Sequence, residues 1–181
     1  MKFNKFLPLS LTVLFLLFPS FLTAKEETQK LSGSIVKGIV EQFVRMHYSQ
    51  KPLNDEMSLR IFSLYMNRLD PAHYYFLASD VNEFRVYETR IDDMLHSGDV
   101  KLALDIFERF KTRLSERLVM MKEFFSEDFD FTRDAKWTLE RNNLPYPESS
   151  EAAREIWRTK IKFDLLTLKL ADTGIKEGKE R

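Results

Sequence analysis

The sequence contains no cysteine among its 181 residues. This absence excludes disulfide bonds, thiolate metal sites, cysteine nucleophiles and a lipid-modified cysteine. Only five glycines are present, and they are too scattered to form a glycine-rich phosphate-binding loop. The 28 basic and 28 acidic side chains give a formal net charge of zero. The sequence therefore lacks the basic footprint that nucleic-acid binding requires, and no nucleic acid is expected as a partner.

Motifs for common catalytic chemistry are also missing. The three histidines, His47, His73 and His96, lie far apart and form no HExxH pair. No serine lies in a G-x-S-x-G turn. Neighbouring acids such as Asp92 and Asp93 point about 100° apart on a helix, so they are interpreted as solvated carboxylates. We therefore predict no catalytic residue, no metal site and no cofactor.

The amino terminus has the pattern of an export signal. Lys2 and Lys5 form a short basic region, and an almost unbroken apolar run follows from residue 6 to residue 22. Ala24 is a small residue of the kind found before a signal-peptidase cut. We expect residues 1–24 to be a signal peptide that is cleaved near Ala24, so that the mature protein is exported. The alternative is an uncleaved membrane anchor, for which the run is short.

The rest of the chain has the periodicity of an all-α protein. Apolar residues recur at spacings of three or four from residue 32 onward, which predicts a bundle of five or six helices. Sixteen phenylalanines and few glycines favour long packed helices in the same way. The residues expected to start or stop these helices are Pro52, Asn54 or Asp55, Pro71, Asp80 with Glu83 as a capping box, and Gly98. One helix is expected between Asp80 and Gly98. The helix before it, which Pro71 stops, is expected to bury Leu59, Phe62, Met66 and Leu69.

The strongest pattern lies between residues 99 and 125, where Asp99 can cap a helix of about six turns. Its predicted buried stripe is Ala103, Phe107, Phe110, Leu114, Leu118, Met121 and Phe125. The charged residues off this stripe are interpreted as a solvated face; they are Glu108, Arg109, Lys111 and Arg113.

Residues 126–150 have no sustained period and are expected to cross the surface as a long irregular segment. A final helix is expected from Ser149 or Ser150 to about Ala171. Its predicted core face is Ala153, Ile156, Trp157, Ile161, Leu165 and Leu168, widened by Phe163, Leu166 and Leu170. A face this broad predicts burial on two sides. The expected domain spans residues 35–171, between a flexible lead-in at 25–34 and a truncated tail at 172–181.

The stretch "LDPAHYYFLASD", residues 69–80, allows two interpretations. His73 could act as a base with Asp70 or Asp80 as its partner. Alternatively, Pro71 ends one helix and the aromatic residues fill the corner before the next, which is the interpretation we favour. Tyr74, Tyr146 and Trp157 are candidates for a partner-binding or structural surface.

Three segments carry a resemblance to a known family: "RIFSLYMNRLDPAHYYFLASDVNEF" (60–84), "WTLERNNLPYPES" (137–149) and "WRTKIKFDLLTLKL" (157–170). Together they resemble the N-terminal region of periplasmic tail-specific proteases, also called carboxy-terminal processing proteases, of peptidase family S41. The resemblance covers residues 35–171. It implies a serine endopeptidase family with a PDZ domain and a Ser-Lys catalytic pair further along the chain. No residue of the present sequence matches either part.

The resemblance leads to one main hypothesis and two alternatives. The main hypothesis is a non-catalytic helical domain or fragment of such a protease, which would contact the rest of the protease chain, a periplasmic adaptor protein and protein substrates. Membrane contact is expected only through the signal peptide. The first alternative is a stand-alone periplasmic binding module without protease activity. The second is an unrelated small helical enzyme that uses His73.

Overall fold

A computed structural model describes residues 32–46, 52–133 and 136–179, with side chains described as far as residue 171. Within these ranges the protein has six helices and no strand, which confirms the predicted all-α fold. The predicted signal peptide lies outside the described residues. Among the described helices, none combines the length and the apolar character that crossing a membrane requires.

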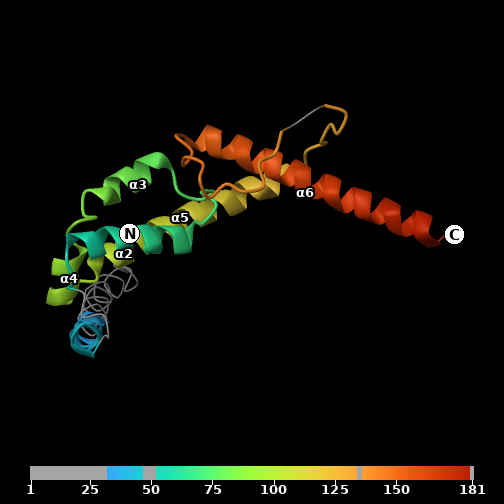
Figure 1. Ribbon diagram of the computed structural model, residues 1–181. Coiled ribbons are helices and arrows are strands. Elements are labelled where there is room, and N and C mark those ends of the chain that lie inside the picture. Colours follow the sequence, from blue (N-terminus) through green and yellow to red (C-terminus); the bar gives the residue numbers. More distant parts are fainter. Residues whose placement is uncertain (1–31, 47–51, 134–135, 180–181) are drawn as a thin grey trace, which may run out of the picture.

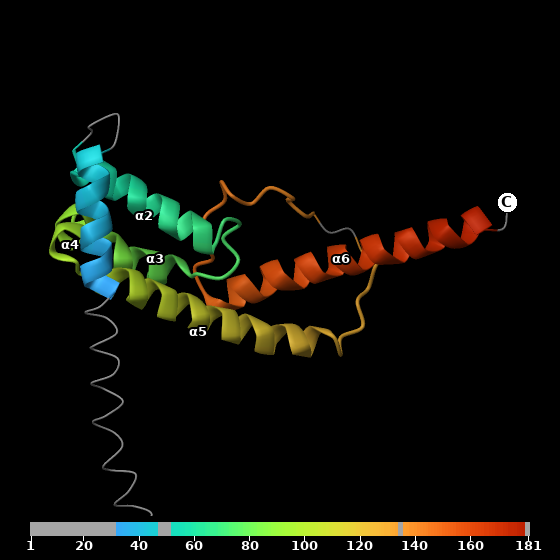
Figure 2. The ribbon, with the colours of Figure 1, turned by 90° about the horizontal axis from the view of Figure 1, so that it is seen from below.

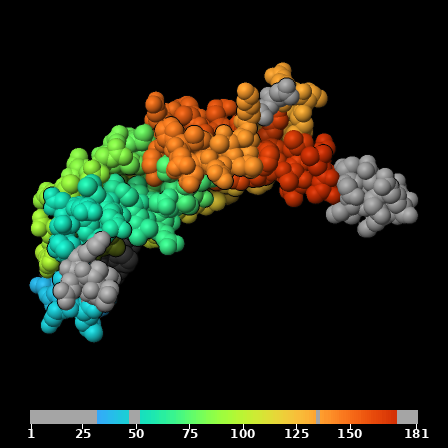
Figure 3. Space-filling view, viewed as in Figure 1, coloured from blue at the N-terminus to red at the C-terminus, as the bar shows by residue number. Residues whose placement is uncertain are grey.

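The first helix covers residues 32–46. The others are α2 (Asp55–Leu69), α3 (Ala78–Arg85), α4 (Ile91–Ser97), α5 (Lys101–Phe124) and α6 (Ser150–Lys179). Helix α2 contacts α4, α3 contacts α5, and α5 contacts α6 (Figure 1). Figure 2 shows that α6 continues well past the part of the molecule formed by α2 to α5. The space-filling view is correspondingly elongated, with α6 and the segment before it at one end (Figure 3).

Several helix ends follow the sequence signals. The Asn54 side chain accepts a hydrogen bond from the Met57 N–H at 3.1 Å and caps α2. Gly98 ends α4 with a φ of 77°, a left-handed conformation that glycine adopts at little cost. The Ser149 hydroxyl accepts from the Ala152 N–H at the start of α6. The irregular segment before α6 is also confirmed over its described residues.

Glycine at position 98 has a second role, because the first helix approaches it closely. A Cβ atom added to Gly33 would lie 2.2 Å from the carbonyl oxygen of Gly98, and one added to Gly98 would lie 2.8 Å from that of Gly33. Real Cβ atoms do not come so close to backbone oxygens. The two glycines therefore allow the backbone of helix 32–46 to contact the end of α4 directly.

The core has two clusters that share α5. The first lies between α2, α3 and α5 and contains Phe62, Met66, Phe76, Val81, Phe84 and Ile106. The second lies between α5 and α6 and contains Met120, Phe124, Trp157 and Ile161. At the surface, Arg154 and Arg158 of α6 pair with Glu123 and Glu127 beside the second cluster. Helix α5 is thus the common wall of both clusters.

The prediction of a single helix between Asp80 and Gly98 is wrong, because a turn at residues 86–90 separates α3 from α4. The change of direction brings α4 against α2. There, the buried Ser58 hydroxyl donates to the Asp92 carboxylate at 2.8 Å and accepts from the Asp92 N–H at 2.8 Å. Asp92 is therefore not the solvated acid that the sequence predicted. Ser58 faces inward on α2, whereas Leu59, which was expected there, is 40% exposed.

The predicted buried stripe of α5 is correct only in part. Phe110 and Met121 pack against the core clusters, but the fully buried face is shifted by one residue. The buried side chains are Ile106, Arg117, Met120 and Phe124. Phe107, Leu118 and Phe125 are instead 41%, 52% and 73% exposed. The helix is turned so that its arginines, rather than a purely apolar stripe, face α3 and the segment that follows α2.

The face of α6 is only partly as expected. Ala153, Trp157 and Ile161 are buried, as the sequence predicted. Leu168 and Leu170 are 67% and 64% exposed, so the described residues do not bury the far half of this helix on two sides. The helix also continues to Lys179 rather than ending near Ala171.

The register of α5 can be tested by comparing two neighbouring residues. We expect Ile106→Ala to lower the free energy of unfolding by about 2–4 kcal/mol, because it removes buried methyl groups from the first cluster. Phe107→Ala is expected to cost only about 1 kcal/mol, since Phe107 is 41% exposed and less of its ring is removed from water. Urea unfolding followed by circular dichroism measures both values. A larger loss for Phe107→Ala would restore the face that the sequence predicted.

Candidate functional site

The residues with chemical potential gather around residues 69–80, here called the elbow, and the face of α5 next to it. The elbow begins at Asp70, which is fully buried directly after α2. Its two carboxylate oxygens accept hydrogen bonds from three successive N–H groups, those of Tyr74, Tyr75 and Phe76, at 2.8–3.0 Å. The chain reaches this position through His73, whose φ of 54° is left-handed. One carboxylate therefore shapes the whole reversal.

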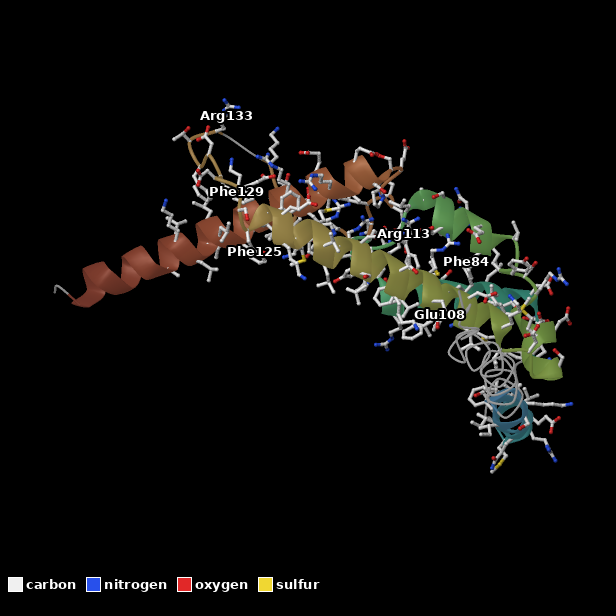
Figure 4. All side chains as sticks on the ribbon, turned by 180° about the vertical axis from the view of Figure 1, so that it is seen from behind. Phe84, Glu108, Arg113, Phe125, Phe129 and Arg133 are labelled. Carbon is white, nitrogen blue, oxygen red and sulfur yellow. The ribbon has the colours of Figure 1, made fainter. Side chains whose placement is uncertain are left out.

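The second buried carboxylate, Asp80, is the third residue of α3. It accepts a hydrogen bond from the Leu77 N–H at 2.9 Å. The residue that caps α3 is therefore Leu77, three residues before the predicted cap at Asp80. Arg113 of α5 donates to both of its oxygens, from Nε at 2.7 Å and from Nη2 at 2.9 Å. Arg109 adds a third charged contact at 2.6 Å. Figure 4 shows Arg113 on α5 beside α3, which carries Phe84.

The electrostatics of this cluster favour the ionised forms. Burial alone would raise the pKa of Asp80, but the hydrogen bonds from Arg113, from the Leu77 N–H and from Arg109 outweigh it and hold the pKa below its usual value. The hydrogen bond to Asp80 raises the pKa of Arg113 in turn. The same contact raises the pKa of Arg109, with a further contribution from Glu83. Asp80 is thus a paired, structural carboxylate.

Arg117 continues this row of arginines into the core. Its side chain is 1% exposed, and its Nη2 donates to the Tyr75 carbonyl at 3.1 Å. Its Nε atom is buried and has no hydrogen-bond partner among the described residues. Burial lowers the pKa of Arg117, because the charged form loses contact with water. Arg117 ties α5 to the elbow at a backbone carbonyl, whereas Arg109 and Arg113 tie it to α3.

An aromatic cluster joins the elbow to α6. The Trp157 ring is 6% exposed, and its Nε1 donates to the Tyr74 carbonyl at 3.0 Å. Its ring centroid lies 5.5 Å from that of Tyr74 and 5.8 Å from that of Tyr75. Trp137, in the segment before α6, stacks on Tyr74 at 6.3 Å. Trp157 is therefore a core residue that holds α6 against the elbow.

Tyr146, in the segment before α6, packs against another part of the elbow. Its ring stacks on His73 with centroids 3.8 Å apart, and burial raises its pKa to about 12. The His73 Nδ1 atom contacts the carbonyl oxygen of Leu144. The structure thus brings Tyr74 and Trp157 together and places Tyr146 against His73. This geometry agrees with the packing interpretation of His73, since the Asp70 and Asp80 carboxylates are occupied by other groups.

The sequence interpretation missed Arg109, Arg113 and Arg117. We assigned Arg109 and Arg113 to a solvated face, and this was wrong because both pair with the buried Asp80. A signal was present, since the three arginines are spaced by four residues and must share one side of a helix. Within the described ranges, no group of three or more histidine, aspartate or glutamate side chains is arranged to hold a metal ion.

The fold and the cluster define an all-helical domain whose central charges bind its own helices together. The family model described as the tail-specific protease N-terminal domain matches residues 39–181. The tail-specific protease of Haemophilus influenzae is 30% identical over 146 residues, which are 80% of this chain and 21% of that protein. The chain belongs to the tail-specific protease N-terminal domain family. It spans about a fifth of the length of this relative.

The role of Asp80 can be tested with a pair of isosteric substitutions. We expect Asp80→Asn to lower the free energy of unfolding by about 2–4 kcal/mol, because Arg109 and Arg113 lose the carboxylate that pairs them. Their partial access to water keeps the loss below that of a fully buried pair. Glu83→Gln removes an exposed partner of Arg109 and is expected to cost less than about 1 kcal/mol. Equal losses in urea unfolding would show that Asp80 has no special role.

Proposed function

We propose that this chain is the non-catalytic helical N-terminal domain of a periplasmic serine endopeptidase that processes or degrades exported proteins from their C-termini. The observation that carries this proposal is the family match over residues 39–181, together with the small share of the relative's length that the chain spans. Catalysis is expected in polypeptide outside this domain.

The engagement of the polar side chains supports a structural role. The side chains of Asp70, Asp80 and His73 all contact other groups of this same domain rather than one another. Two lysines of α6 are similarly occupied, since Lys160 donates to Asp164 at 2.6 Å and Lys162 to the Arg133 carbonyl at 3.1 Å. A catalytic lysine has to lie beside its serine nucleophile and be free to accept its proton. Groups held in this way position helices.

The domain's contribution to proteolysis would be mechanical. Helix α6 is held against the elbow by Trp157 and extends well beyond the other helices (Figure 2). A stiff helix of this kind can hold neighbouring polypeptide at a fixed distance and frame the path of a protein substrate. Tyr74 and Tyr146, each partly exposed, remain the candidates for contact with an adaptor protein, whereas Trp157 is too buried to offer such a surface.

The proposal predicts the size and the activity of the native product. An immunoblot of a periplasmic extract with an antibody to residues 80–125 should detect a band several-fold larger than the 21.5 kDa of this chain. The purified 181-residue chain should cleave no unfolded protein, because it carries no catalytic pair. A single band of about 19 kDa, the size left after signal removal, would favour the stand-alone binding module. Serine-dependent cleavage by this chain would contradict the proposal directly.

A further inference from the structure

Helix α5 has an apolar face that the described helices leave uncovered. Phe107, Leu118 and Phe125 follow one another at spacings of 11 and seven residues, so they lie in a row along one side of the helix. Leu114 and Met121 lie between them and are half-buried, and Met121 also packs against the second core cluster. We call these five residues the α5 stripe. In Figure 4, α5 lies on the near side of the molecule, and no described helix crosses in front of it.

The exposed members of the α5 stripe, Phe107, Leu118 and Phe125, lie on a different side of the helix from its core face. The core face is formed by Ile106, Arg117, Met120 and Phe124, about 100° around the helix from the centre of the stripe. On the other side of the stripe the surface becomes polar, with Lys111 lying 5.5 Å from the centre of the Phe107 ring. The helix therefore has two apolar faces, of which the described residues cover one.

The size of the stripe decides between its possible occupants. Its three exposed members present on the order of 300 Å² of side-chain surface. A stable complex between separate chains buries about 800 Å² on each partner, so the stripe alone is too small to hold a second copy. A tethered domain needs less area, because a short linker gives it an effective concentration in the millimolar range.

We propose that the α5 stripe is the docking surface for the remaining polypeptide of the tail-specific protease chain. The inference rests on the proposed function. In the Haemophilus influenzae relative, about four fifths of the chain lies outside the matched region. In a protein of that length, covalently linked polypeptide is present to cover the stripe. Docking would bury Leu118 and Phe125 and would fix the domain, and with it α6, relative to the rest of the protease.

Two adjacent residues of α5 provide a matched test. Leu118 on the stripe and Val119 are 52% and 58% exposed, yet Val119 lies on the polar side of the helix with Thr112, Ser115 and Glu116. Because the sequence contains no cysteine, Leu118→Cys and Val119→Cys each introduce a single thiol into it. The variants are made in the native gene. Alkylation by iodoacetamide is then followed by peptide mass spectrometry in that gene's product and in the 181-residue chain.

In the 181-residue chain, we expect Leu118→Cys and Val119→Cys to react at similar rates. In the longer product, Leu118→Cys should react at least about tenfold more slowly than Val119→Cys, because docked polypeptide covers it. Similar rates in the longer product would overturn the inference while leaving the proposed function intact. Slow reaction of Leu118→Cys in the 181-residue chain, with the sedimentation mass of a dimer, would identify a second copy as the occupant and also overturn it. A native product no longer than 181 residues would refute the proposed function and this inference together, and its size alone reveals that case.

Discussion

The buried carboxylate of Asp80 is the constraint on which the arrangement of the helices depends. It accepts hydrogen bonds from the Leu77 N–H just before α3 and from two arginines of α5, which holds the two helices in one orientation. Once α5 is fixed in this way, Arg117 faces the elbow, and Met120 and Phe124 face α6. A charge that is costly to bury is tolerated because several donors surround it, and those same donors set the register of α5 against α3.

The helices and the elbow could be read from the sequence, because their signals are local. Pro71, Gly98 and Ser149 mark helix ends through local chemistry that does not depend on distant partners. The face of α5 could not be read in the same way. Arg109 and Arg113 have the pattern of a solvated face until their partner, 29 to 33 residues earlier, is known to be buried beside them. The break between α3 and α4 depends similarly on a tertiary contact, that of Ser58 with Asp92.

The hydrogen-bond partners of the polar side chains support the structural role that we propose. Histidine, aspartate and arginine side chains can form active sites. In the elbow, however, these polar groups form hydrogen bonds with N–H groups, carbonyls and arginines of the same domain. The candidate surface of Tyr74, Tyr146 and Trp157 was identified from sequence as a set of aromatics. The structure divides it into a core residue and two partly exposed rings on different sides of the elbow. This use of the polar groups supports the positioning role that we propose for the domain, which belongs to the tail-specific protease N-terminal domain family.

The central claim is that Asp80 and the α5 arginines act as one unit, and a double-mutant cycle tests it most directly. Urea unfolding of the wild-type chain, Asp80→Asn, Arg113→Gln and the double variant gives the coupling free energy between the two side chains. We expect a coupling of at least about 1.5 kcal/mol, because each substitution removes the same pair of hydrogen bonds. Losses that add to within about 0.5 kcal/mol would show that the two residues contribute independently and that another contact sets the register of α5.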